Sequence, residues 1–177
     1  MSISVVGIAI GAIIATRVMS LIGRKYGFIL ASIGNTLFSI LAAYSIYSQN
    51  FILFCFANVF IGIGMAFTHQ YRFAAAESVN KEMAPKAISI ILFGGIISAF
   101  LGPSLANFSK DLISENLYVG SYLALALLTF IPSILFLFYE DKSKFEINLQ
   151  YKGRSYIELI SQPRFFQAVC ASAFGYA

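Results

Sequence analysis

Long apolar runs separated by short polar turns dominate the chain. No Asp, Glu, Lys or Arg occurs from Tyr26 to Tyr71, from Ala87 to Ser109 or from Asn116 to Tyr139. An α-helix rises 1.5 Å per residue, so about 20 apolar residues cross a bilayer. The first interval therefore fits two spans joined by a turn, and each of the other two fits one span. A further apolar run lies close to Met1.

The pattern predicts an all-α, polytopic transmembrane helical bundle. The apolar runs are continuous, whereas the strands of a membrane barrel alternate apolar and polar residues. Five helices are expected, over residues 3–22, 28–47, 51–76, 86–108 and 118–138. A polar cytosolic loop is expected over 140–163, and residues 164–177 are expected to start a further membrane helix.

Composition excludes an ordinary soluble domain. Charged residues make up 11% of the chain and hydrophobic residues 59%, whereas a soluble domain carries roughly a quarter charged residues. The formal net charge of +4 does not indicate nucleic acid, because the cations lie in short loops beside apolar runs, as the positive-inside rule predicts. The basic turn Gly23, Arg24 and Lys25 is thus expected on the cytosolic side. The predicted partner is a lipid bilayer, and the predicted location is the cell inner (plasma) membrane.

Residues for catalysis are missing from the sequence. The chain has one His and two Cys and contains no metal-binding cluster or nucleophile motif. Both Cys55 and Cys170 lie in apolar segments, so no structural disulfide is expected. We therefore expect no enzyme activity, no metal and no cofactor.

One polar stripe interrupts the third apolar segment. Asn58, His69 and Arg72 recur at helical spacing, with Gln70 beside them. Polar groups inside a membrane indicate a functional site by default, here a substrate path or gate. Two structural interpretations stay open: a hydrogen-bonded network between helices, and an Arg72 side chain that extends to the cytosolic interface.

Small residues form a second pattern in the fourth apolar segment. Gly94, Ser98, Gly102 and Ala106 are spaced four apart on one helix face, and Pro103 favours a kink. Such a face lets another backbone approach closely, so it predicts helix packing or a pliable helix beside a gate. In the first segment, Gly7, Gly11 and Ala15 have the same spacing, and packing alone explains them.

Three of these places resemble the major facilitator superfamily of secondary transporters. Gly23, Arg24 and Lys25 match the end of its basic motif between helices two and three, and Gly94, Gly102 and Pro103 match its fifth-helix motif. Asn58 stands where the family often has Arg. The resemblance implies helices two to six, a central loop and the start of helix seven: an incomplete N-terminal half of a twelve-helix fold. The runs 72–77 and 85–89 resemble a bacterial, riboflavin-type branch.

The resemblance implies a secondary carrier that moves a small-molecule solute by alternating access. One incomplete bundle cannot alternate access alone, so its partner would be the missing transporter half or another copy of the chain. The alternative from the residues is a small integral membrane protein that dimerises through the Gly94, Ser98 and Gly102 face, as a scaffold or as a dimeric carrier.

Overall fold

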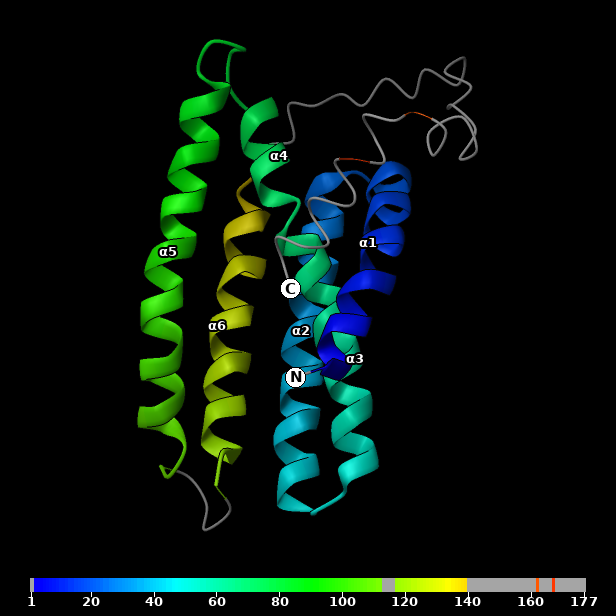
Figure 1. Cartoon of the computed structure of the whole chain (residues 1–177), viewed down its shortest axis with the longest axis vertical. Coiled ribbons are helices and arrows are strands. Elements are labelled where there is room, and N and C mark those ends of the chain that lie inside the picture. Colours follow the sequence, from blue (N-terminus) through cyan, green and yellow to red (C-terminus); the bar gives the residue numbers. More distant parts are fainter. Residues whose placement is uncertain (1, 113–116, 140–161, 163–166, 168–177) are drawn as a thin grey trace. The chain divides into compact units, whose positions relative to one another are not determined.

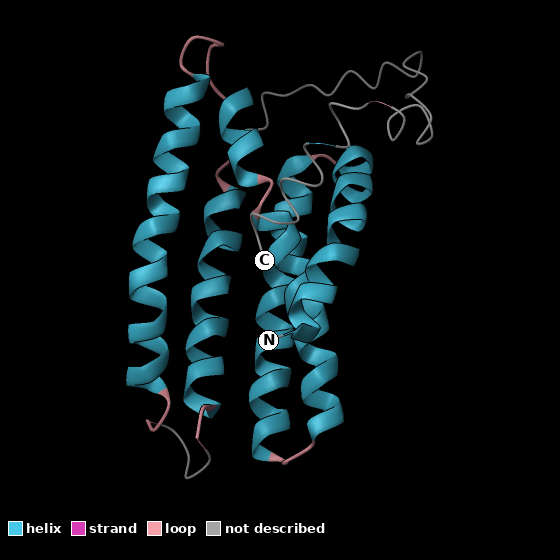
Figure 2. Cartoon of the chain, in the orientation of Figure 1, coloured by secondary structure: helices cyan, strands magenta, loops and turns pink. Residues whose placement is uncertain are grey.

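The computed structural model describes residues 2–112 and 117–139, together with Gln162 and Gln167. In the two longer stretches the chain is helical, and Figure 2 shows helices joined by short loops. The helices are α1 (Ser2–Ile22), α2 (Arg24–Tyr47), α3 (Phe51–Thr68), α4 (Tyr71–Glu77), α5 (Ala84–Ser109) and α6 (Val119–Leu137). The loop expected at 140–163 and the helix start expected at 164–177 fall outside these stretches.

Among the described residues, five segments are long and apolar enough to cross a membrane. They are Ile3–Ile22, Arg24–Tyr47, Phe51–Glu77, Ala84–Ser109 and Val119–Leu137. Each lies where an apolar run predicts a span, and α3 and α4 together make the third. Side chains on the outside of these helices are mainly large and apolar, which suits contact with lipid tails rather than with water.

A single residue separates α1 from α2. Gly23 has φ 82°, a left-handed conformation that glycine adopts without the clash a Cβ would cause. The basic turn expected at residues 23–25 is therefore shorter than the sequence indicates. Arg24 and Lys25 belong to the first turn of α2. Cations at this end of a helix oppose its dipole, so these two side chains need partners elsewhere.

The third span is interrupted at His69 and Gln70. The His69 amide donates to the Met65 carbonyl (3.2 Å), whereas the Gln70 amide donates to Phe67 (3.0 Å), only three residues back. Both residues keep right-handed helical dihedral angles, so the chain continues in a similar direction as α4. The local change from four-residue to three-residue bonding tightens the turn and re-aims the side chains that follow.

The closest helix approach joins α1 to α3. A Cβ placed at Gly7 would overlap the Val59 carbonyl, and one at Gly62 would overlap the Ser4 carbonyl. Gly11 likewise abuts the backbone of Ile63. Absence of side chains lets the two backbones touch, which is how membrane helices gain dispersion contacts. The small face of the first segment is thus a packing face, as its spacing predicts.

The centre of the bundle is α2, which packs against α3 and α6. Phe28 is fully buried, and its ring lies 4.8 Å from Tyr71 and 4.9 Å from Phe136, measured between centroids. Ser32 donates a hydrogen bond of 2.5 Å to the Thr129 carbonyl of α6. Hydroxyl groups that bond across helices satisfy themselves inside hydrocarbon and fix the register of the two helices.

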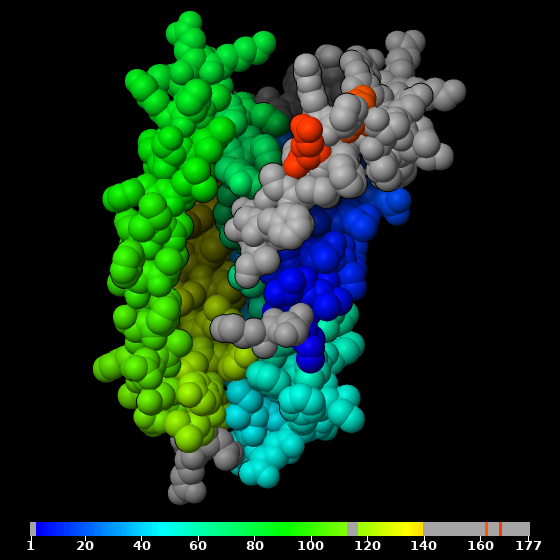
Figure 3. Space-filling view, in the orientation of Figure 1, coloured from blue at the N-terminus to red at the C-terminus, as the bar shows by residue number. Residues whose placement is uncertain are grey.

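The least enclosed helix is α5. It contacts α4 and α6, yet the residues from Ser89 to Phe108 are all exposed. Figure 1 shows α5 along one side of the bundle. In Figure 3 the surface of α6 lies recessed between α5 and α1. One edge of this recess is therefore a helix whose side chains have few partners in the described part of the chain.

Candidate functional site

Asn58, the first member of the predicted polar stripe along the chain, is held by two hydrogen bonds. Its side-chain amide donates to the Phe54 carbonyl (2.9 Å), and its oxygen accepts from the Tyr122 hydroxyl of α6 (3.2 Å). Tyr122 also packs edge-on against Phe54, with ring centroids 5.5 Å apart. Asn58 is half-buried. It therefore belongs to an interhelical network, and one of its two amide hydrogens has no protein acceptor among the described residues.

The other members of the stripe lie at the far end of the third span. This end is called the basic end here, because Arg24, Lys25 and Arg72 lie there. His69 follows Asn58 by 11 residues, or about 16 Å along a helix. Between them, Gly62 packs against α1 and Met65 is exposed. The stripe is therefore not one continuous polar surface, but two polar positions separated by a packed and an apolar residue.

A pocket of about 370 Å³ opens at the basic end between the α3–α4 turn and α5. It is lined by Thr68, His69, Tyr71, Arg72, Ile91, Leu92, Gly95 and Ser98. The predicted residues His69 and Arg72 thus meet Ser98 of the small-residue face, from a helix that the sequence alone does not place beside them. Gly95 has open space where a Cβ would stand, so the α5 wall of the pocket is hollow at that point.

Arg72 has no carboxylate partner in the part of the chain that the structure describes. Its guanidinium lies over the Phe73 ring, 5.0 Å from the centroid. Glu77, the acid of the same helix, is paired instead with Arg24 at 2.6 Å. Since five residues turn an α-helix by about 140°, Arg72 and Glu77 point to different sides. Arg72 therefore lines the pocket as an exposed cation without an ion-pair partner among the described residues.

Gln70 does not line this pocket. It lies at the N-terminus of α4, where its carbonyl accepts from the amides of Phe73 and Ala74 at 3.1 Å each. Because Gln70 lies in the tight turn, its side chain points in a different direction from the side chain of His69. The structure therefore brings together His69 and Arg72 but neither Gln70 nor Asn58 with them.

At Gly94 and Gly102 the small-residue face of α5 has no helix against it in the described stretches. No heavy atom lies within 4 Å of a Cβ built at Gly94 or Gly102. The Ser98 hydroxyl donates to the Gly94 carbonyl of its own helix (3.1 Å). Near the other end, the Ala106 carbonyl accepts from the Ser121 hydroxyl of α6 (2.6 Å). The helix continues through Pro103 to Ser109. A packing role for this face stays a prediction.

Two contacts at the basic end join distant parts of the chain. The ion pair between Arg24 and Glu77 links the start of α2 to the end of α4. Lys25 donates to the Leu137 carbonyl at the end of α6 (2.8 Å). A positive charge at the C-terminal end of a helix interacts favourably with the helix dipole. From the sequence, both cations are expected in a turn and no partner is predicted for either. The one local indication of a partner was an acidic residue, Glu77, at the end of an apolar run.

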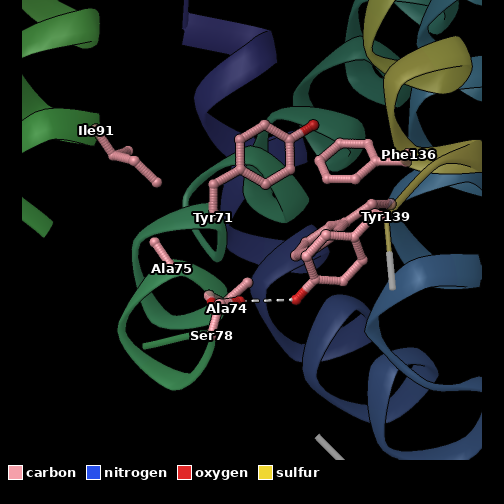
Figure 4. A pocket seen from close by; sticks show the side chains of 8 residues that line it. Tyr71, Ala74, Ala75, Ser78, Ile91, Phe136 and Tyr139 are labelled. Carbon is pink, nitrogen blue, oxygen red and sulfur yellow. Dashed lines mark hydrogen bonds between the residues drawn. The ribbon is translucent and has the colours of Figure 1, made fainter. Parts of the chain in front are cut away.

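A second pocket, of about 210 Å³, is lined by four aromatic residues among eight (Figure 4). Tyr71, Phe136 and Tyr139 lie around it, and Ser78 pairs with the Tyr139 hydroxyl at 3.1 Å. Tyr71 separates this pocket from the one that contains Arg72, because it lines both. Sequence reasoning missed this cluster, since tyrosines at the ends of spans are also typical of the membrane interface.

Comparison with known proteins then decides the family. The model of the Major Facilitator Superfamily matches residues 1–177. The chain belongs to the major facilitator superfamily. It is also 30% identical over 173 residues to the riboflavin transporter RfnT of Brucella anthropi, an alignment that covers 97% of this chain. No solved structure matched the chain.

Membership of the major facilitator superfamily confirms three expectations. The chain is a multi-pass membrane protein, its fold is a part of the superfamily's helical bundle, and it belongs to a family of carriers rather than enzymes. The chain spans 44% of the length of the riboflavin transporter it matches. In the stretches that the structure describes, no three His, Cys, Asp or Glu side chains are placed to hold a metal ion.

Proposed function

We propose that the chain is part of a secondary carrier that moves a small solute across the plasma membrane by alternating access. The pocket containing Arg72 is the observation that carries this proposal. It places ionisable and hydroxyl groups inside a bundle whose surface is otherwise apolar. Such groups are costly within a membrane and are retained along solute or ion paths. Membership of a superfamily of carriers supports the same conclusion.

Within this proposal, two levels of the path have separate roles. Asn58 is a solute or gating contact near the middle of the third span, held in place by Tyr122. His69 and Arg72, with Gln70 beside them, form the cytosolic gate. The face of α5 from Gly94 to Ala106, with its internal Pro103, is the pliable wall opposite that gate. In rocking-bundle carriers the solute site lies between two such bundles near the bilayer midplane.

Riboflavin is the first solute to test. The support is the 30% identity with a riboflavin transporter over nearly the whole of this chain. The experiment expresses the chain, together with the coding sequence that adjoins it, in a bacterium that needs external riboflavin, and measures uptake of labelled riboflavin. We expect uptake above that of the empty vector. No uptake by a well-expressed, membrane-inserted protein would refute riboflavin as the solute.

The roles of Asn58 and Arg72 have their own variants. Asn58→Ala and Arg72→Gln are expected to lower uptake by about tenfold or more, because the first removes the hydrogen bonds of Asn58 and the second removes the positive charge from the pocket. Asn107→Ala is the matched control, since Asn107 is exposed near the opposite end of α5. If Asn58→Ala is inserted normally and transports at the unchanged rate, Asn58 is not a solute contact.

The bare face of α5 supports a second candidate, a dimerising membrane protein. Gly94 and Gly102 have open space around them, and a second copy of the chain could approach there as small-residue faces do. Molecular mass in detergent, measured by light scattering with and without Gly102→Leu, separates the candidates. If the native chain is a dimer and Gly102→Leu is a monomer, the second candidate is favoured. If both proteins are monomers, the dimerisation proposal is refuted and the carrier proposal remains.

A further inference from the structure

We infer that the pocket between the α3–α4 turn and α5 binds an anionic group, so that the carrier prefers solutes with a phosphate or carboxylate group over neutral solutes such as riboflavin. This inference rests on the proposed carrier function and extends it. The charge of the lining carries the argument. The ionisable groups on the pocket wall are Arg72 and His69, and the acid of α4, Glu77, is already occupied by Arg24.

The lining also offers hydrogen-bond donors at several points. Thr68 and Ser98, which bear hydroxyl groups, line the pocket. Ser98 uses its hydrogen on the Gly94 carbonyl, so it must rotate before it donates to a ligand. Arginine presents a planar fork of N–H groups that matches phosphate and carboxylate oxygens in pairs. Positive charge with donors and no acid complements an anion and disfavours a cation.

The depth of the pocket favours a solute over a surface contact. Arg72 lies five residues before the end of α4, which is about 7 Å along the helix, and Ser98 lies 12 residues after Lys86, or about 18 Å. The 26 residues of α5 span about 39 Å, and the hydrocarbon core is about 30 Å thick. The pocket therefore extends from near the headgroups toward the bilayer midplane. The Arg72 side chain is exposed and has no acidic partner among the described residues, so within a membrane it needs water or an anion.

The apolar wall sets the size of the ligand. Ile91 and Leu92 close one side of the pocket, and Gly95 leaves the space of a side chain free. A volume of about 370 Å³ is at the lower end of the range for small-molecule sites, which are about 300–1,000 Å³. The site accepts a molecule with one charged end and an apolar body.

Riboflavin 5′-phosphate and riboflavin test the inference, because the two molecules differ by one phosphate group. Flavin fluorescence is excited by visible light, which protein side chains do not absorb, so its anisotropy can be followed directly. The purified chain is titrated in neutral detergent micelles. We expect the phosphate to bind at least about tenfold more tightly than riboflavin, as one charge-assisted bidentate contact provides. Equal affinity for both flavins overturns the inference.

Variants assign the preference to the pocket. Arg72→Gln is expected to bring the two affinities within about twofold of each other, and His69→Gln to reduce the preference less. Arg17→Gln is the matched control, because Arg17 is an exposed cation of α1 that does not line the pocket. If Arg72→Gln fails to fold by circular dichroism, Arg72→Lys keeps the charge but loses the fork, and a reduced preference is expected. An undiminished preference in a folded Arg72 variant overturns the inference.

A lipid headgroup has the same chemistry and is tested separately. The titration is repeated in nanodiscs of phosphatidylcholine alone and with phosphatidylglycerol. Unchanged preference in both supports a soluble anion. If phosphatidylglycerol abolishes flavin phosphate binding and stays bound to the native chain but not to Arg72→Gln, the anion is a lipid and the solute assignment falls. Failure of riboflavin uptake alone refutes riboflavin as the solute but leaves an Arg72-dependent anion site standing.

Discussion

The Arg24 guanidinium lies 2.6 Å from the Glu77 carboxylate, across 53 residues of sequence. The Arg24 side chain is 15% exposed and the Glu77 side chain 46% exposed. This asymmetry decides what each side chain loses without the other. Glu77 regains water when Arg24 is removed, whereas Arg24 keeps a largely desolvated charge when Glu77 is removed.

We therefore predict that Glu77→Ala destabilises the bundle more than Arg24→Gln does. The expected costs are about 2 kcal/mol for Glu77→Ala and about 1 kcal/mol or less for Arg24→Gln. Thermal unfolding in detergent, followed by circular dichroism, measures both. Glu82→Ala serves as the control, because Glu82 is an exposed acid in the next connection. Equal effects of the two pair variants would show that burial of Arg24 is not the deciding factor.

Glycine substitutions should separate the packed face from the bare one. Gly62→Ala forces α1 and α3 apart, because a Cβ there overlaps the Ser4 carbonyl. Gly102→Ala meets no atom within 4 Å and gains about 1 kcal/mol of helix propensity. In the chain by itself we expect a lower melting temperature for Gly62→Ala and an unchanged or higher one for Gly102→Ala. Glycine-to-alanine substitution changes the intrinsic helix propensity equally in both variants. An equal fall in melting temperature for the two variants would therefore argue against the α1–α3 contact.

Tyr122→Phe tests the network around Asn58. The variant removes the hydroxyl that donates to the Asn58 oxygen and keeps the ring that packs on Phe54. Interhelical hydrogen bonds in membranes contribute about 0.6 kcal/mol on average, so the expected loss of stability is small. Tyr118→Phe is a suitable comparison, because the Tyr118 side chain is exposed. In the carrier, uptake should fall with Tyr122→Phe if Asn58 must be oriented to contact the solute.

Membrane topology is testable by cysteine labelling in intact cells. With Cys55 and Cys170 replaced by Ser, a cysteine at Ser20 or at Ser143 should resist an impermeant maleimide. One at Ser48, in the turn at the opposite end of α2, should react. The cation asymmetry of the loops is the reason for this expectation. Labelling of Ser20→Cys from outside would reverse the orientation.

The positions of the helices could be predicted from sequence because burial in lipid depends on composition and run length. Runs of about 20 apolar residues contain the information needed to place a span, and they locate all five. The close packing at Gly7 was also predictable, since small residues four apart identify a helix face without reference to its partner. Both properties are local to one segment.

The pairing of side chains across segments could not be predicted in the same way. Arg24 pairs with Glu77, and Lys25 donates to the Leu137 carbonyl, because the start of α2 lies at the same side of the bundle as the ends of α4 and α6. The helical spacing of Asn58, His69 and Arg72 also suggested one stripe. The contact of Gly62 with α1 lies between Asn58 and His69, and the three-residue bond at Gln70 changes the helix beyond His69. Neither feature follows from periodicity, because each depends on a neighbour distant in sequence.

The single-residue link at Gly23 restricts how the bundle can move. With one residue between them, α1 and α2 cannot slide or swing independently, and the close contact at Gly7 and Gly62 couples α3 to the same unit. By contrast, α5 is joined through residues 78–83 on one side and 110–118 on the other, and its length is almost free of buried contacts. Displacement during a transport cycle is therefore expected to concentrate in α5, whose motion alone changes the width of the pocket that it shares with Arg72.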